Sequence, residues 1–88
     1  MVSVHYPADE AVLAEALFTS HLQASDTTVP AETVREVVAA HLARHGPDGC
    51  AGLVAYEFGE HPYCAVRRMA WARRTVRATF GPPALQSA

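Results

Sequence analysis

Helix-breaking residues at intervals along the chain constrain its fold more than any other sequence feature. They divide the 88 residues into four segments with apolar residues at helical spacing. The breakers are Pro7, Pro30, the Gly-Pro-Asp-Gly cluster at 46–49, Gly59, Pro62 and the Gly-Pro-Pro run at 81–83. This spacing predicts helices over about residues 8–24, 30–45, 49–58 and 62–80. We therefore expect an all-α fold, a compact antiparallel bundle of four helices with short loops.

The ends of these segments have residues that suit helix termini. Pro30 suits the first turn of a helix, and Gly46 is placed to end that helix. Asp48 is a candidate N-cap for the third segment, and Gly59 is a candidate stop for it. Gly81, followed by two prolines, ends the fourth segment.

The length and the two ends of the chain predict a simple domain organisation. A chain of 88 residues has room for one hydrophobic core, which we expect within residues 8–81. Residues 1–7 alternate like a strand and are expected to form an N-terminal extension, either coil or an intermolecular strand. Residues 82–88 are expected to be a flexible tail.

The composition excludes several classes of protein. Half of the residues are apolar and 18% are charged, the reverse of the balance in a disordered chain. No apolar run approaches the roughly 18 residues that a membrane span needs, and the first residues lack the pattern of a signal peptide. Two cysteines are too few for a disulfide framework. These features predict a cytoplasmic protein with free thiols and no contact with a membrane.

The charges are divided unevenly along the chain. All seven basic residues are Arg, and residues 61–88 contain five of them with no acidic residue. Residues 1–60 contain two Arg and nine acidic residues, so a net charge of −2 is the sum of +5 and −7. The predicted helix over 62–80 is thus a basic element attached to an acidic body.

A tryptophan on this basic helix indicates a binding surface. On a helical wheel Trp71 lies almost opposite the apolar stripe that includes Ala65, Val66 and Val76. Trp and Arg together are typical of interface hot spots. We expect this helix to contact an acidic protein or a second copy of the chain in a homodimer; the other way to cover Trp71 is the first helix of the same chain, if the basic helix is central. The predicted partner-binding residues are Arg67, Arg68, Trp71, Arg74 and Arg77.

The protein is therefore expected to be a small binding or regulatory protein, and a nucleic-acid-binding regulator is the alternative that uses the same helix. Nucleic-acid-binding domains are usually basic overall, so the net charge of −2 disfavours that alternative. Within the fold, Arg73 and Glu57 both fall on predicted apolar faces. A buried Arg73–Glu57 ion pair would satisfy both charges.

A second alternative rests on histidines and cysteines. His41 and His45 lie one helical turn apart, a spacing that presents two imidazoles to one metal ion. Cys50, His61 and Cys64 follow closely and complete a candidate set of zinc ligands. A small dimeric enzyme would use His41 and His45 with Cys50 or Cys64, although no catalytic motif accompanies them. The competing interpretation is structural, with Cys50 and Cys64 as small apolar residues and His45 at a helix C-terminus.

Overall fold

The computed structural model describes residues 10–24 and 29–81 and contains three helices in these ranges. They are α1 (Glu10–Phe18), α2 (Ala31–Glu60) and α3 (Pro62–Phe80). The expectation of an all-helical chain is confirmed for the described residues. The predictions for residues 1–7 and 82–88 concern parts of the chain that lie outside them.

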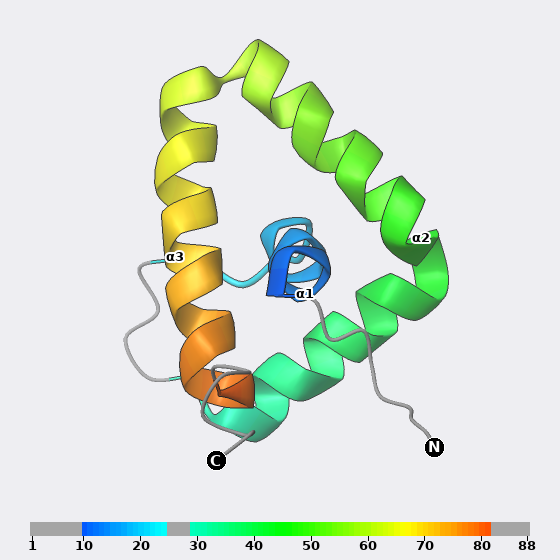
Figure 1. Ribbon diagram of the computed structural model, residues 1–88, viewed down its shortest axis with the longest axis vertical. Helices are drawn as coiled ribbons and strands as arrows, with labels where there is room; N and C mark the ends of the chain where they lie inside the picture. The colour runs from blue at the N-terminus through cyan, green and yellow to red at the C-terminus, as the bar shows by residue number, and fades with distance from the viewer. Residues whose placement is uncertain (1–9, 25–28, 82–88) are drawn as a thin grey trace.

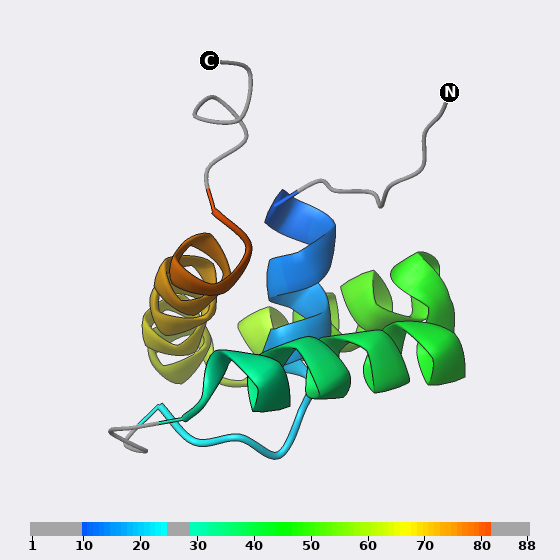
Figure 2. The same ribbon diagram turned by 90° about the horizontal axis from the view of Figure 1, so that it is seen from below.

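The helices do not form an antiparallel bundle of four, so that prediction is wrong. Figure 1 shows α2 and α3 along the sides of a triangle, with α1 seen nearly end-on in its middle. In the perpendicular view α1 stands upright between the other two helices (Figure 2). Because α1 has neighbours all round, five of its nine residues are buried: Leu13, Ala14, Ala16, Leu17 and Phe18.

A bend in α2 replaces the loop expected between the second and third helices. Gly46 has φ 75° and ψ 165°, values outside the helical region that favour glycine. The helix resumes directly afterwards, because Pro47 lacks a backbone N–H and fits the first turn after a bend. The breaker at Gly46 thus acts where the sequence predicts. It turns the chain within one bent element, which supplies two sides of the triangle in Figure 1.

Helix α1 ends at Phe18, six residues before the predicted end at Ala24. The hydroxyl of Thr19 donates to the carbonyl oxygen of Ala16 at 2.8 Å, and that of Ser20 donates to Leu17 at 2.6 Å. These side chains satisfy carbonyl groups that a continuing helix would bond through its backbone. The local bonds therefore stop the helix, although the apolar pattern continues to Leu22.

A single residue, His61, separates α2 from α3. Its backbone N–H donates to the carbonyl of Glu57 at 2.7 Å, closing the last turn of α2. Pro62 then begins α3, where its missing N–H costs no helical hydrogen bond. The resulting corner, at the top of Figure 1, returns α3 along the side of α1.

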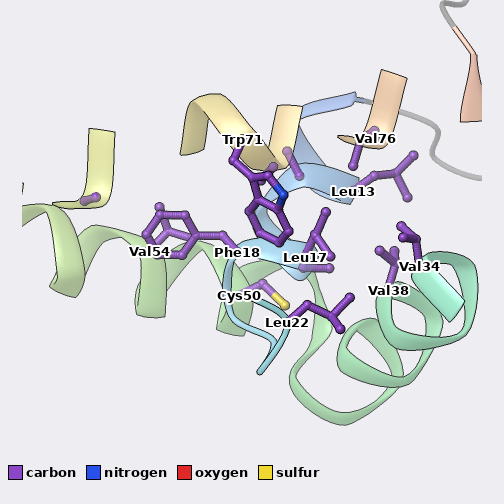
Figure 3. Close-up of a cluster of buried hydrophobic side chains, with 14 residues drawn as sticks. Leu13, Leu17, Phe18, Leu22, Val34, Val38, Cys50, Val54, Trp71 and Val76 are labelled. Carbon is purple, nitrogen blue, oxygen red and sulfur yellow. The ribbon is translucent and has the colours of Figure 1, made fainter. Parts of the chain in front are cut away.

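The core is one cluster to which all three helices contribute (Figure 3). Leu17 and Ala16 from α1 are completely buried, and Cys50 from α2 is equally inaccessible. No side-chain nitrogen or oxygen atom of the described residues is buried without a hydrogen-bond partner. The larger labelled members are Leu13, Leu17, Phe18, Leu22, Val34, Val38, Val54, Trp71 and Val76.

Candidate binding site on α3

Trp71 is a core residue covered within the chain, although the helical wheel places it away from the apolar stripe. Its exposed fraction is 9%, and its indole points from α3 into the cluster beside Leu17 and Phe18 (Figure 3). Val66, expected in the core stripe, is 57% exposed. The error arises because α3 packs against both α1 and α2, so its buried arc is wider than one stripe and is rotated toward Trp71. A second copy of the chain is not needed to cover this tryptophan.

Arg68 has a structural role at the end of α1. Its Nε donates to the carbonyl oxygen of Phe18, and its Nη2 donates to that of Ser20, each at 2.8 Å. Its guanidinium carbon also lies 4.9 Å from the ring centroid of Trp71 and 5.6 Å from that of Phe18. Partial burial lowers the pKa of Arg68 from its ordinary value. The guanidinium is therefore occupied within the chain.

Arg73 and Arg77 are paired with the first residue of α1. Their Nε atoms lie 3.0 Å and 2.9 Å from the two carboxylate oxygens of Glu10. These bonds lower the pKa of Glu10 below its ordinary value, with the Arg77 bond the largest cause. The predicted buried Arg73–Glu57 pair does not form. Both side chains are substantially exposed, and Glu57 instead lies 3.1 Å from Nδ1 of His61.

Arg67 and Arg74 are the two predicted partner-binding arginines whose charge is not used inside the described structure. Both are exposed, and no hydrogen bond or ion pair joins either to a residue in 10–24 or 29–81. They lie seven residues apart on α3, a helix without acidic residues. Two helical turns bring them to the same side of the helix. The predicted set of five therefore divides into two arginines without a partner among the described residues and three residues with contacts inside the fold.

A groove follows this side of α3. It consists of two adjoining hollows of about 490 Å³ and 480 Å³, which share Ala24, Trp71 and Arg74. We call it the α3 groove. From α3 it is lined by Cys64, Arg67, Arg68, Ala70, Trp71, Arg74, Thr75, Ala78 and Thr79. Its other wall contains Leu22, Ala24, Val29, Ala31 and Val34. An apolar floor thus lies beside two positive charges that have no partner among residues 10–24 and 29–81.

The residues of the second wall of the groove were not predicted from the sequence. Ala24 and Val29 come from the connection between α1 and α2, and neither residue type indicates a binding role. Their place beside Trp71 depends on where α1 ends, which the apolar pattern alone does not reveal. The hydroxyls of Thr19 and Ser20, which follow the last helical residue, are the one local signal for that end.

The five candidate metal ligands do not come together. His41 Nδ1 lies 2.9 Å from the carbonyl oxygen of Val37, and the His41 and His45 ring centroids are 6.0 Å apart. Cys50 is buried and its thiol donates to the carbonyl of His41 at 3.8 Å, whereas Cys64 is exposed. Among the residues that the structure describes, no three His, Cys, Asp or Glu side chains are grouped to hold a metal ion.

Two further findings do not concern the α3 groove. Within residues 10–24 and 29–81, none of the helices has both the length and the apolar character needed to cross a membrane. Comparisons with protein families, with curated proteins and with solved structures find no match for this chain.

Proposed function

We propose that this protein is a binding module that holds an acidic segment of a partner protein in the α3 groove. The observation that carries the proposal is the position of Arg67 and Arg74 beside Trp71. Both arginines are exposed and unpaired within the described residues, and they flank a groove lined mainly by apolar side chains. Arg and Trp beside an apolar hollow is the composition of energetic centres in protein interfaces.

The pairing of the other arginines favours a protein partner over a nucleic acid. Arg68 bonds α1, while Arg73 and Arg77 share the single carboxylate of Glu10. Along the groove, the arginines without a partner in the described part of the chain are Arg67 and Arg74. Two such charges are far fewer than the roughly six to ten phosphate contacts of a strongly salt-dependent DNA-binding protein. An apolar groove also matches the side chains of a protein segment better than it matches a sugar-phosphate backbone.

The structure also weakens the reason for a homodimer. That expectation rested on Trp71 and on the division of charge between residues 1–60 and 61–88. Trp71 is only 9% exposed, so the chain itself already covers it. A partner with carboxylates would instead meet charges that the chain itself does not neutralise in the described residues. An acidic partner is therefore favoured over a second copy.

The experiment is a titration of the isotope-labelled protein followed by NMR. The first probe is an equimolar mixture of 15-residue peptides that all contain six Glu and four Leu in scrambled order. The second is a 20-base-pair DNA duplex. We expect the peptide mixture to shift amide signals of residues along the groove, with weaker effects as salt is raised.

Charge reversal provides the matched comparison. Arg67→Glu combined with Arg74→Glu should abolish the shifts, because repulsion replaces both attractive contacts. Arg35→Glu combined with Arg44→Glu reverses two exposed arginines on α2 that do not line the groove, and it should leave the shifts in place. No shift with the peptides, or equal loss in both double variants, would overturn the proposal. Stronger binding of the duplex would assign the surface to nucleic acid instead.

A further inference from the structure

We infer that the segment bound in the α3 groove is an amphipathic α-helix lying along α3, with two carboxylates seven residues apart and apolar residues between them. This inference rests on the proposed function and specifies the partner. Its basis is the spacing of the two free arginines and the shape of the surface between them.

The spacing of Arg67 and Arg74 matches a helix better than a strand. Seven residues of α3 correspond to a rise of about 10.5 Å. A partner helix packed nearly parallel or antiparallel to α3 repeats that distance between its own residues i and i+7, which share one face. In an extended strand, same-face residues recur at about 6.8 Å and 13.6 Å, so neither interval matches.

The surface between the two arginines suits an apolar contact. Ala70 is exposed and lines the groove, and its methyl side chain permits close approach of a second helix. Beside it, Trp71 lines both hollows although most of its side chain is buried. On a partner helix, positions i+3 and i+4 lie between the two carboxylates and on the same face, so apolar residues there would contact Ala70 and Trp71.

The length of the groove sets the length of the partner helix. Its lining residues on α3 extend from Cys64 to Thr79, which corresponds to about 22 Å along the helix axis. A partner helix of about 15 residues would cover that distance. Ala78, also exposed, lines the 490 Å³ hollow toward the C-terminal end of α3.

The chain does not supply this pattern to a second copy of itself. On its three described helices the carboxylates are Glu10, Glu15, Glu32, Glu36, Asp48, Glu57 and Glu60. No two of them are seven residues apart, so no described helix has the required register. The helical segment is therefore expected from a different protein.

The test uses three synthetic 15-residue peptides of nearly equal composition and without tryptophan. The matched peptide has Glu at two positions seven apart with Leu at the third and fourth positions after the first Glu. The shifted peptide has the same residues with the two Glu four apart. The third is the matched peptide with a central proline, which prevents a continuous helix. Trp71 is the chain's only tryptophan, so its emission reports occupancy of the groove.

We expect the matched peptide to bind and to gain helical circular dichroism on binding, while the shifted and proline peptides bind about tenfold more weakly or less. Arg67→Ala and Arg74→Ala should each weaken the matched peptide about fivefold, whereas Arg35→Ala should not. The bound matched peptide should also slow alkylation of Cys64, the exposed thiol that lines one hollow.

The outcomes separate this inference from the proposed function. Equal affinity of all three peptides, with dependence on Arg67 and Arg74, would overturn the helical register while leaving acidic-segment binding intact. Tighter binding of the proline peptide would likewise overturn it. If no acidic peptide binds, both the inference and the proposed function fail.

Discussion

The guanidinium of Arg68 should contribute more to stability than that of any neighbouring arginine, because it joins α3 to the end of α1. It donates two charge-assisted hydrogen bonds to the carbonyl oxygens of Phe18 and Ser20 and lies over Trp71. Arg68→Met removes the charge and both bonds while keeping a long apolar side chain in place. The neighbouring Arg67→Met makes the same chemical change at an exposed position without a partner among the described residues.

The expected loss can be worked from the contacts. A hydrogen bond to a charged group is worth about 1.5–3 kcal/mol net when buried. Because Arg68 is only partly buried, we assign about 1 kcal/mol to each bond. The stacking on Trp71 adds about 0.5 kcal/mol. Arg68→Met should therefore lower the free energy of unfolding by about 2–3 kcal/mol, whereas Arg67→Met should change it by less than about 0.5 kcal/mol.

Urea denaturation followed by circular dichroism measures the difference. With a slope of about 1.5 kcal/mol per molar urea, the midpoint of Arg68→Met should fall by between about 1 and 2 M. Arg68→Lys should recover part of the loss, because an ammonium keeps the charge without the two-pronged donor geometry. Equal midpoints for Arg68→Met and Arg67→Met would refute the assignment of Arg68 as the connection between α3 and α1.

Three further predictions concern other parts of the fold. Glu10→Gln should destabilise the protein at neutral pH, and its urea midpoint should converge with that of the wild type at acid pH. Because the pKa of Glu10 is lowered in the folded protein, its ion pairs stabilise the fold at pH values above its ordinary pKa of 4.5. This stabilisation is lost as the pH falls through the pKa of the folded state. A difference in urea midpoint that persists at acid pH would contradict this. Gly46→Ala should cost about 1–3 kcal/mol from its positive φ, whereas Gly52→Ala, in open helical space, should stabilise by about 0.5–1 kcal/mol; similar midpoints for the two variants would rule out backbone strain. A thiol reagent should titrate Cys64 in the native protein and Cys50 only after unfolding, because burial raises the pKa of the Cys50 thiol and blocks access; two rapid equivalents would be inconsistent with a buried Cys50.

Local sequence signals predict the helical segments well, because each depends on a few neighbouring residues. The apolar periodicity identifies α2 and α3, and Gly46 and Gly81 have positive φ where the breakers were expected to act. The angles between helices are not local. The Gly46-Pro47 pair is compatible with a loop between two helices or with a bend inside one helix. The prediction of an antiparallel bundle assumed the loop. The bend lets α2 pack around α1, which is rich in leucine and alanine and lies at the centre of the fold. This packing cannot be read from the sequence near Gly46.

The helix that carries the candidate site was predicted, but the partners of its individual side chains were not, because these contacts are also non-local. A helical wheel treats the five arginines of 61–88 as one positive surface. It contains no information on whether Glu10 or the carbonyl of Phe18 lies opposite a given guanidinium, because these groups are 50 or more residues away in sequence. For Trp71 the wheel located one apolar stripe, whereas a helix with two neighbours buries a broader arc.

The division of the α3 arginines into those paired and those unpaired within the described residues affects which partners the α3 groove can select. A charge of +5 on residues 61–88 would attract any polyanion. Among the described residues, Arg73 and Arg77 share the carboxylate of Glu10 and Arg68 bonds α1. Arg67 and Arg74, two helical turns apart, are then the two guanidinium groups of α3 without a partner. Two charges at a fixed distance discriminate by spacing, whereas five close together act mainly through total charge. Moreover, Arg68 and Trp71 line the groove and also hold α1, so the contacts that fix the central helix also form part of the proposed binding surface.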